Sequence, residues 1–337
     1  MTALSMRKPA GWGPAAKMNL SDIYKPVQKD LKKVEQSLEE ITDVEFSLLA
    51  HLLAYTLKTG GKRVRPALTL LSGKFYNYEP HLLVPMGAAI ELLHTATLVH
   101  DDIVDNSPVR RGKPTVSRAW GENSALLLGD YLFAKAGSLV AGTGNLRAVK
   151  LFSQTLMTIS AGELKQTGVT SDTAKLRDYY FAWIGAKTAC LFSTSTESGA
   201  ILSQAPEEAI EAIGDYGRNL GMAFQIVDDV LDFVGEEDEL GKPVGSDLRE
   251  GTLTLPTILF AESYPEDKLI KNFFGKKDAE DVSQAVAKIR DSRVIADCLT
   301  LASEFCSKAR RAAEKLPDNS ARKSLIDLAA YIVERRK

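Results

Sequence analysis

Apolar residues recur at helical spacing along nearly all of the chain from about residue 20 onward, whereas the strict alternation of half-buried strands is scarce. Two runs, Met86–Val99 and Ala186–Gly199, are apolar or small on nearly every side, which is typical of helices that other helices enclose. The pattern therefore predicts an all-α protein. The helices are expected near residues 24–42, 45–59, 63–77, 85–106, 122–141, 145–168, 173–203, 206–234, 252–263, 278–290, 292–315 and 320–335.

The chain shows no division into separate units. Its 337 residues contain no internal repeat and no Pro/Ser-rich linker, so residues 20–337 are expected to form a single large helical domain. Residues 1–19 are expected to be a disordered lead-in, because the first 17 residues combine Gly, Pro and Ala with three basic side chains and no acidic ones. A remnant of a targeting peptide is the alternative for this lead-in.

Composition narrows the classes of function. Hydrophobic residues make up 45% of the chain and charged residues 26%, and the net charge of −2 provides no global field that would attract nucleic acid. The three cysteines have no metal-ligand spacing, which favours buried thiols in a reducing, cytoplasmic compartment. The apolar stretch closest to transmembrane length, Ala125–Val140, is interrupted by Asp130 and Lys135, so no membrane-spanning segment is expected.

An acidic signature occurs twice, each time after an apolar helical run, as Asp101-Asp102-Ile103-Val104-Asp105 and as Asp228-Asp229-Val230-Leu231-Asp232. Each copy falls near an expected helix C-terminus, where the negative end of the helix dipole disfavours further negative charge. A lone acidic motif is more often a solvated helix face, but both copies are embedded in apolar sequence. Hard divalent cations, which take oxygen ligands, would offset this charge. The candidate metal ligands are Asp101, Asp102, Asp105, Asp228, Asp229 and Asp232.

Basic residues cluster in short motifs that suit phosphate oxygens. The segment Gly60–Pro66 places glycines and cations at an expected helix start, where backbone N–H groups and the positive end of the dipole attract anions. If this segment stood alone, a solvated flexible loop would be the simpler interpretation. Arg110 and Arg111 follow the first acidic motif closely, and Lys187 interrupts a small, apolar helix. The candidate anion-binding residues are Lys62, Arg65, Arg110, Arg111, Lys187 and Lys242.

Together the acidic and basic motifs predict a site for diphosphate esters that metal ions bridge. The charged loops Ser107–Thr115 and Gly235–Gly251 follow the acidic motifs and are expected to be mobile lids. The chain has no Gly-rich loop followed by Lys-Ser/Thr, so nucleotide hydrolysis is not supported. Its four histidines suggest no Ser/His/Asp triad.

The ordered motifs resemble those of the trans-isoprenyl diphosphate synthases, and the match runs from about residue 50 to 260. The resemblance implies the isoprenoid synthase fold, in which helices surround a central cavity, and a prenyltransferase that is a homodimer or one half of a heteromer. The matching elements are Gly60-Gly61-Lys62-Arg63-x-Arg65-Pro66, His94…Asp101-Asp102-x-x-Asp105…Arg110-Arg111-Gly112, Gly185-Ala186-Lys187-Thr188-Ala189, Phe224-Gln225-x-x-Asp228-Asp229-x-x-Asp232 and Gly241-Lys242-Pro243.

The same resemblance implies roles within the site. An allylic diphosphate would be held through three Mg²⁺ ions by the two aspartate motifs. The residues expected to steady this diphosphate are Arg110, Lys187 and Lys242. The residues expected to form a metal-free pocket for isopentenyl diphosphate are Lys62, Arg65, His94 and Arg111. Thr188 and Gln225 would position the reacting carbons.

The implied reaction needs no protein nucleophile. The allylic C–O bond ionises to a carbocation, the isopentenyl double bond attacks that carbocation, and a proton is then lost. The metal ions and cationic side chains stabilise the departing diphosphate, where negative charge develops. The catalytic group implied for this chain is Asp101, Asp102, Lys187, Thr188, Gln225 and Asp228.

The length of the product is expected to depend on the residues just before the first aspartate motif. Ala96 and Thr97 lie about one helical turn, roughly 5–6 Å, deeper than Asp101 if this helix lines the cavity. A bulky aromatic side chain there would stop a growing chain early, whereas small side chains favour an open channel and a long polyprenyl product. The floor of this channel is expected to come from another helix, with Leu132 and Phe133 as candidates. The alternative is a geranylgeranyl diphosphate synthase in which Ala96 and Thr97 are ordinary packing residues and the floor is built elsewhere.

Two rival classes share part of this pattern. A class I terpene cyclase also uses an aspartate motif and Mg²⁺, but its second motif resembles Asn-Asp-x-x-Ser-x-x-x-Glu, whereas the motif at Asp228–Asp232 is again acidic. A regulatory subunit of a heteromeric synthase resembles the fold but loses acidic motifs, and this chain keeps both. The sequence therefore favours a catalytic chain.

Overall fold

The computed structural model describes residues 19–58, 60–166, 175–235, 244–267 and 279–335. Within these ranges the chain is built of helices with one two-stranded hairpin, which confirms the all-α prediction. The N-terminal elements are α1 (Leu20–Ile23), η1 (Lys25–Val27), α2 (Gln28–Glu40), α3 (Ser47–Leu57), α4 (Val64–Gly73), α5 (Pro80–Val104), β1 (Val109–Arg110), β2 (Lys113–Pro114), α6 (Val116–Trp120), α7 (Glu122–Gly142) and α8 (Leu146–Gln166). The C-terminal elements are α9 (Leu176–Ile184), η3 (Gly185–Ala189), α10 (Cys190–Leu202), α11 (Glu207–Val234), α13 (Ser246–Glu250), α14 (Leu255–Ser263), α16 (Ala279–Asp291), α17 (Val294–Ala313) and α18 (Ser320–Glu334).

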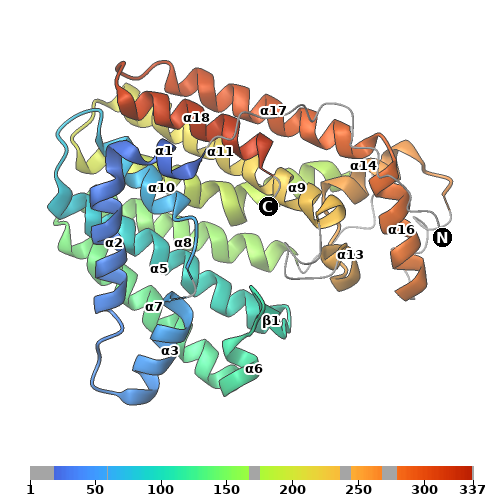
Figure 1. Cartoon of the computed structure of the whole chain (residues 1–337), viewed down its shortest axis with the longest axis horizontal. Coiled ribbons are helices and arrows are strands. Elements are labelled where there is room, and N and C mark those ends of the chain that lie inside the picture. Colours follow the sequence, from blue (N-terminus) through green and yellow to red (C-terminus); the bar gives the residue numbers. More distant parts are fainter. Residues whose placement is uncertain (1–18, 59, 167–174, 236–243, 268–278, 336–337) are drawn as a thin grey trace.

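The long helices form a layered bundle. Figure 1 shows α17 and α18 along the upper edge, next to α11, and α3 and α6 along the lower edge. At the N-terminal end, Pro26 lies in the short 3₁₀ turn η1, so the helix expected over 24–42 begins as α1 and continues as α2. The expected lead-in lies almost wholly outside the described residues.

Helix α5 is the central helix and carries the first aspartate motif at its C-terminal end. Pro80 occupies its first turn, where a missing N–H leaves no bond unmade, so the helix starts earlier than the expected 85–106. Every residue from Met86 to Leu93 is buried, with α2, α4, α7 and α10 packed around the helix. The prediction that other helices enclose this run is confirmed.

The stretch expected as one helix over 173–203 is interrupted. Between α9 and α10, five residues form the π-helical turn η3, a geometry that adds one residue to a helical turn and is common at functional sites. Helix α10 is buried along nearly its whole length against α4 and α11. Gly199 permits the close approach to α4, because a Cβ at this position would collide with the backbone carbonyl of Thr69.

The first expected lid loop, Ser107–Thr115, contains the antiparallel hairpin β1–β2. Its two turn residues, Arg111 and Gly112, have φ values of 51° and 74°, as a type I′ turn requires. The hairpin was not expected, because Arg-Gly is not among the strong turn signals. In the second expected loop, Gly235–Gly251, residues 246–250 form α13, and residues 236–243 lie outside the described residues.

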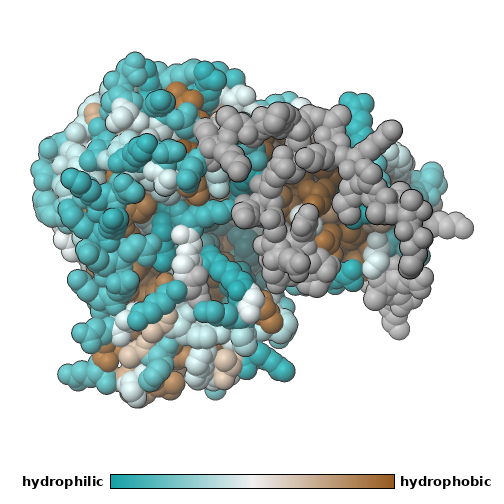
Figure 2. All heavy atoms as spheres, in the orientation of Figure 1, coloured by the Kyte–Doolittle hydropathy of each residue, from teal (hydrophilic) through white to brown (hydrophobic). Residues whose placement is uncertain are grey.

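Two described helices, α5 and α7, are long and apolar enough to cross a membrane by length and composition alone. This corrects the expectation that no stretch reaches such a length. The most apolar window of α5 is 72% buried inside the protein, as in a core helix, whereas that of α7 is 33% buried. Figure 2 shows hydrophilic residues over much of one face and hydrophobic residues gathered at its lower edge near α3 and α6, where Phe46 and Trp120 are exposed.

Candidate active site

The first aspartate motif ends α5, as expected. Asp101 and Asp102 lie in its last turns and Asp105 is its C-cap. Asp102 Oδ1 accepts a hydrogen bond from Arg110 Nε at 2.7 Å, and Asp101 Oδ2 lies 3.4 Å from Lys187 Nζ. The motif therefore meets two of the predicted phosphate-binding cations directly.

Burial disfavours the negative charge of this acidic cluster, and the neighbouring cations offset that effect only in part. It raises the pKa of Asp102, although Arg110 opposes the shift. It also raises the pKa of Asp105, where Lys187 opposes the shift and Asp101 adds to it. Carboxyl groups in this condition favour the approach of a further cation.

The first aspartate of the second motif pairs with the end of α18. Asp228 Oδ1 lies 2.7 Å from Arg335 Nη2, and the Arg335 side chain is 5% exposed. Burial raises the pKa of Asp228, while Arg335 and then Lys62 and Arg65 oppose the shift. The second acidic motif thus lies within electrostatic reach of the basic Gly60–Pro66 segment.

Asp229 belongs to a chain of hydrogen bonds rather than to an open carboxylate cluster. Tyr180 Oη donates to Asp229 Oδ2 at 2.6 Å, and Gln225 Nε2 donates to Asp229 Oδ1 at 2.9 Å. Thr188 Oγ1 in turn donates to Gln225 Oε1 at 2.7 Å. Burial, reinforced by Asp247, raises the pKa of Asp229 well above its usual value.

The two motifs face one region of the protein. The charge of Asp247, on α13, raises the pKa of both Asp105 and Asp229. Asp232 Oδ2 accepts a hydrogen bond from the backbone N–H of Asp247 at 3.2 Å, which fixes α13 to the second motif. Asp247 therefore lies within electrostatic reach of both motifs.

The π-helical turn η3 connects the two sides. Lys187 Nζ lies 2.8 Å from Glu163 Oε1 on α8 and 3.4 Å from Asp101, while the next residue, Thr188, points to Gln225 on α11. The prediction that Lys187 is paired with an anion is confirmed. Glu163 was missed, because a single carboxylate in an amphipathic helix gives no sequence signal of its partner.

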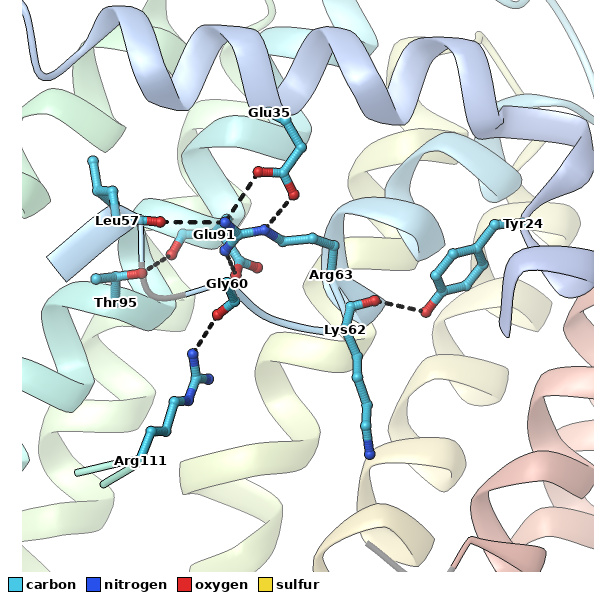
Figure 3. Close-up of polar contacts among 9 residues, drawn as sticks. All are labelled: Tyr24, Glu35, Leu57, Gly60, Lys62, Arg63, Glu91, Thr95 and Arg111. Carbon is cyan, nitrogen blue, oxygen red and sulfur yellow. Dashed lines mark hydrogen bonds and ion pairs between the residues drawn. The ribbon is translucent and has the colours of Figure 1, made fainter. Parts of the chain in front are cut away.

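Adjacent arginines on the hairpin take separate partners. Arg110 precedes the turn and bonds Asp102, whereas Arg111 lies in the turn and donates from Nη1 to the Gly60 carbonyl at 2.6 Å. The φ of Arg111 is in the left-handed region, which costs a non-glycine residue about 1–3 kcal/mol. The hairpin therefore brings the loop after the first motif against the Gly60–Pro66 segment (Figure 3).

Arg65 and His94 are partly buried within this basic region. The guanidinium of Arg65 lies 4.7 Å from the ring centroid of Phe192, and its Nε has no hydrogen-bond partner among the described residues. Burial lowers the pKa of Arg65. Burial, then Arg65 and Arg111, lowers the pKa of His94 well below its usual value, so the imidazole is neutral at neutral pH. Such a buried, unpartnered Nε suits an anionic ligand.

A pocket opens beside these groups, between α3, α5, the hairpin and α6. Its chemistry is mixed, with cationic and acidic side chains on one wall and apolar residues on the other. The polar groups that line it include Glu91, His94, Asp102, Arg110, Arg111 and Lys113. The pocket thus unites members of the predicted isopentenyl and allylic sets.

The remaining predicted residues have different outcomes. Ala96 is fully buried in α5, and Thr97 is half-buried with its Oγ1 donating to the His94 carbonyl at 2.7 Å. Of the candidate floor residues, Leu132 is fully buried and Phe133 stacks edge-on against His100. Lys242 lies outside the described residues.

The carboxylates fit a hard divalent cation by their chemistry. No group of three or more His, Cys, Asp or Glu among the described residues is arranged to hold an ion, because arginine and lysine side chains pair with several of the aspartates. All of the candidate ligands nevertheless offer oxygen atoms, and burial raises the pKa of Asp102, Asp105 and Asp228. A divalent cation would balance this negative charge.

An all-α bundle that brings two aspartate motifs and a basic pocket to one region defines a prenyltransferase that acts on diphosphates. The "Polyprenyl synthetase" family model matches residues 46–289, and the chain belongs to that family. It is 36% identical over 319 residues to heptaprenyl diphosphate synthase component 2 from Geobacillus stearothermophilus, over 94% of this chain and 99% of the relative.

Solved structures share the whole architecture. A polyprenyl synthase from Caulobacter crescentus CB15, complexed with calcium and isoprenyl diphosphate, has a TM-score of 0.90 at 33% identity, over 96% of this chain and 100% of that one. A decaprenyl diphosphate synthase from Rhodobacter capsulatus has a TM-score of 0.87 at 36% identity, over 95% and 100% of the two chains. The predicted isoprenoid synthase fold and trans-prenyltransferase activity are confirmed.

Proposed function

We propose that this chain condenses an allylic diphosphate with isopentenyl diphosphate repeatedly, giving a long-chain all-trans polyprenyl diphosphate. The observation that carries the proposal is the pocket that brings Asp102 of the first motif together with His94, Arg110 and Arg111. The allylic diphosphate on the acidic side and isopentenyl diphosphate on the basic side would then meet with their carbons adjacent. Relatives named as heptaprenyl and decaprenyl diphosphate synthases support a long product.

The allylic diphosphate is assigned to the space between the two aspartate motifs. Mg²⁺, three ions by the resemblance, would be held by carboxylates of these motifs and would neutralise the leaving diphosphate. Of these carboxylates, Asp101, Asp102 and Asp228 make ion pairs with protein cations. Those pairs orient the carboxyl groups until the substrate arrives. The calcium in the Caulobacter crescentus structure supports a divalent ion in this family.

Protein cations stabilise the same diphosphate. Lys187 and Arg110 already lie beside the first motif, so each can exchange its carboxylate partner for a phosphate oxygen with little movement. Lys242 is proposed for the same role. The Thr188–Gln225 hydrogen bond fixes both polar groups, and we assign them to the positioning of the reacting carbons. Because the side chains of Thr188 and Gln225 are fixed before the reaction, they stabilise the transition state without having to reorganise.

Isopentenyl diphosphate is assigned to the basic pocket of Lys62, Arg65, His94 and Arg111. His94 lines the pocket as a neutral imidazole, which can donate one hydrogen bond without adding charge. Arg65 offers a buried, unsatisfied guanidinium nitrogen.

Product length is assigned to the α5 residues just before the first motif. Ala96 and Thr97 present small side chains one turn before Asp101, and we propose that they leave room for a long chain. A geranylgeranyl diphosphate synthase is the alternative function. It would require Ala96 and Thr97 to be ordinary packing residues and a floor built by other residues.

The apolar surface of α7 and α8 supports an assembly with a second chain. Leu127 is 67% exposed, Leu146 85%, Met157 63% and Leu164 75%. Contacts with a second chain would remove these apolar side chains from water. We propose a homodimer, with a heteromer as the alternative because one relative is named as a component. A cytoplasmic location is proposed with it.

The decisive experiment incubates the purified chain alone with Mg²⁺, isopentenyl diphosphate and farnesyl diphosphate, and separates the dephosphorylated products by chromatography. The proposal expects a ladder that ends at a long polyprenol. A product that stops at geranylgeraniol would establish the alternative function. Absence of any elongation would overturn the stand-alone enzyme, and size-exclusion chromatography of the same sample reports the oligomeric state.

A further inference from the structure

Arg63 lies inside the basic Gly60–Pro66 segment, yet its guanidinium is committed to the protein. Its Nε donates to Glu35 Oε1 at 2.6 Å and its Nη2 to Glu35 Oε2 at 3.1 Å. Its Nη1 donates to Glu91 Oε1 at 2.6 Å, and Nη2 also donates to the Leu57 carbonyl at 3.4 Å. Every nitrogen of the group is engaged, so Arg63 is not placed to bind a substrate phosphate.

The three charged side chains form a largely buried cluster. The Arg63 and Glu91 side chains are each 9% exposed, and that of Glu35 is 41% exposed. Removing such charges from water is costly unless the geometry of the pairs is good. Here Glu35 binds two nitrogens of the planar guanidinium, an arrangement that fixes orientation as well as charge. The cluster joins α2, the start of α4 and the middle of α5.

The backbone of Arg63 is strained. Its φ of 47° and ψ of 36° lie in the left-handed region, where a non-glycine residue costs about 1–3 kcal/mol and persists only if its surroundings fix it. The neighbouring carbonyls are also tied: Tyr24 Oη donates to the Lys62 carbonyl at 3.1 Å and Arg111 to the Gly60 carbonyl. Figure 3 shows the Lys62 side chain extending away from the acidic residues that hold Arg63.

We propose that Arg63, clamped by Glu35 and Glu91, is a positioning residue that fixes the turn from which Lys62 and Arg65 reach isopentenyl diphosphate. The proposal rests on the proposed function, which assigns that substrate to the basic pocket. The left-handed residue sends the Arg63 side chain to the acidic side, while the Lys62 side chain extends the other way (Figure 3). Without the ion pairs of Arg63 the strained turn relaxes. The side chains of Lys62 and Arg65 are then no longer oriented toward the same substrate.

Glu91 connects the Arg63 cluster to the basic pocket. It lines the pocket one turn before His94, and its charge raises the pKa of Arg65 and Arg111 against the effect of burial. A fixed carboxylate among these arginines offsets their mutual repulsion. The aspartate motifs do not contact this cluster in any described ion pair. Its loss should therefore weaken isopentenyl diphosphate binding and spare the allylic diphosphate.

The test measures both Michaelis constants in the full-length chain carrying Glu35→Gln or Arg63→Lys. Glu35→Gln keeps the shape of the side chain and removes its charge, and Arg63→Lys keeps the charge and removes the fork. For each we expect KM for isopentenyl diphosphate to rise roughly tenfold, and KM for the allylic primer to change by less than about twofold. The double variant should raise KM for isopentenyl diphosphate little more than either single variant does, because the two residues act as one unit.

Matched variants separate positioning from folding. Glu39→Gln makes the same substitution one turn along α2 at an exposed carboxylate and should leave both constants unchanged. Arg63→Gly removes the backbone strain together with the clamp, and should raise KM for isopentenyl diphosphate as Arg63→Lys does. Because Glu35 is partly exposed, Glu35→Gln is expected to stay folded, and calorimetric binding of isopentenyl diphosphate provides a readout that needs no turnover.

Three results would overturn the clamp. Unchanged Michaelis constants in folded Glu35→Gln and Arg63→Lys would contradict the positioning role. A loss of thermal stability without a change in either Michaelis constant would contradict it too. Equal rises of both Michaelis constants would show a general structural role instead. Failure of the proposed function looks different. In that case the wild type would not elongate, or Arg65→Met would leave isopentenyl diphosphate binding intact, and the positioning role would fall with the pocket.

Discussion

Arg335 Nη2 lies 2.7 Å from Asp228 Oδ1, so a residue at the end of α18 neutralises the leading carboxylate of the second aspartate motif. The same arginine donates to the Phe224 carbonyl at 2.7 Å and its guanidinium lies 4.0 Å from the Phe224 ring centroid. If Asp228 is a metal ligand, Arg335 occupies its oxygen while the ion is absent. The arginine and the ion then compete for one carboxylate.

Replacing Arg335 should therefore make divalent ions bind more tightly. Arg335→Met keeps the packing against Phe224 and removes the competing charge, which is worth about 1 kcal/mol or fivefold in affinity. We expect the Mg²⁺ concentration for half-maximal rate to fall by about this factor at saturating substrates. Arg310→Met, which removes an exposed pair with Glu314, is the control. An unchanged or higher Mg²⁺ requirement in a folded variant would contradict the competition.

The hydrogen bond from Tyr180 to Asp229 should stabilise the folded protein. Tyr180→Phe leaves a buried carboxyl with one donor fewer, which we expect to lower the free energy of unfolding by about 1–2 kcal/mol in urea titrations. It should also lower kcat, because Asp229 orients Gln225. Tyr264→Phe, at a ring that is 45% exposed, should change neither quantity. Equal stabilities of the Tyr180 variant and the wild type would exclude this role.

A bulky side chain at position 96 should shorten the product. Ala96 is fully buried one turn before Asp101, so Ala96→Phe places an aromatic ring where a growing chain is expected to pass. We expect loss of several isoprene units from the final product, with turnover retained, as measured by chromatography of the dephosphorylated chains. Val104→Phe adds the same ring to a side chain of α5 that is 66% exposed and should keep the wild-type length. Wild-type products from Ala96→Phe would refute the assignment of the channel wall.

Neutral His94 should make the protein sensitive to acid. Burial and the nearby arginines lower the pKa of His94 well below its usual value, whereas a histidine in the unfolded chain titrates near pH 6.5. Below that pH the unfolded state binds one more proton than the folded state, so the free energy of unfolding falls as the pH falls. The stabilising contribution is fully present only above about pH 6.5.

The size of this effect follows from the two protonation equilibria. Between pH 7.5 and 5.5 the wild type should lose about 1.4 kcal/mol more of its unfolding free energy than His94→Gln, which cannot take up the proton. Denaturant titrations at both pH values measure the difference. His81→Gln removes an imidazole that is 71% exposed and should behave as the wild type. Identical pH dependence in the wild type and His94→Gln would show that the buried imidazole carries no such penalty.

The helices and the charged motifs could be predicted because each leaves a local signal. Apolar periodicity marks α5 and α11, and the repeated aspartates at their C-terminal ends combine residue type with spacing. Lys187 could be found because a lysine in an apolar helix needs a partner. These signals lie within a few residues of one another, which is the range over which pattern and propensity act.

The partners of those motifs could not be predicted, because they come from distant helices. Glu35, Glu163, Tyr180 and Arg335 are single polar residues in otherwise ordinary amphipathic helices, and only packing brings them to the site. The η3 turn was missed for another reason. One extra residue in a helical turn changes neither composition nor apolar content, so a continuous helix over 173–203 fitted the pattern equally well.

The π-helical turn η3 also constrains the number of residues in this segment rather than their type. Each residue advances an α-helix by about 100°, so the additional residue in η3 changes the rotational phase of α10 relative to α9. That phase points Lys187 at Asp101 while Gly199 still meets α4. Deleting one residue of this turn would leave the other motifs unchanged in sequence yet rotate one of these contacts out of place. Insertions and deletions, more than substitutions, should therefore be excluded from this turn.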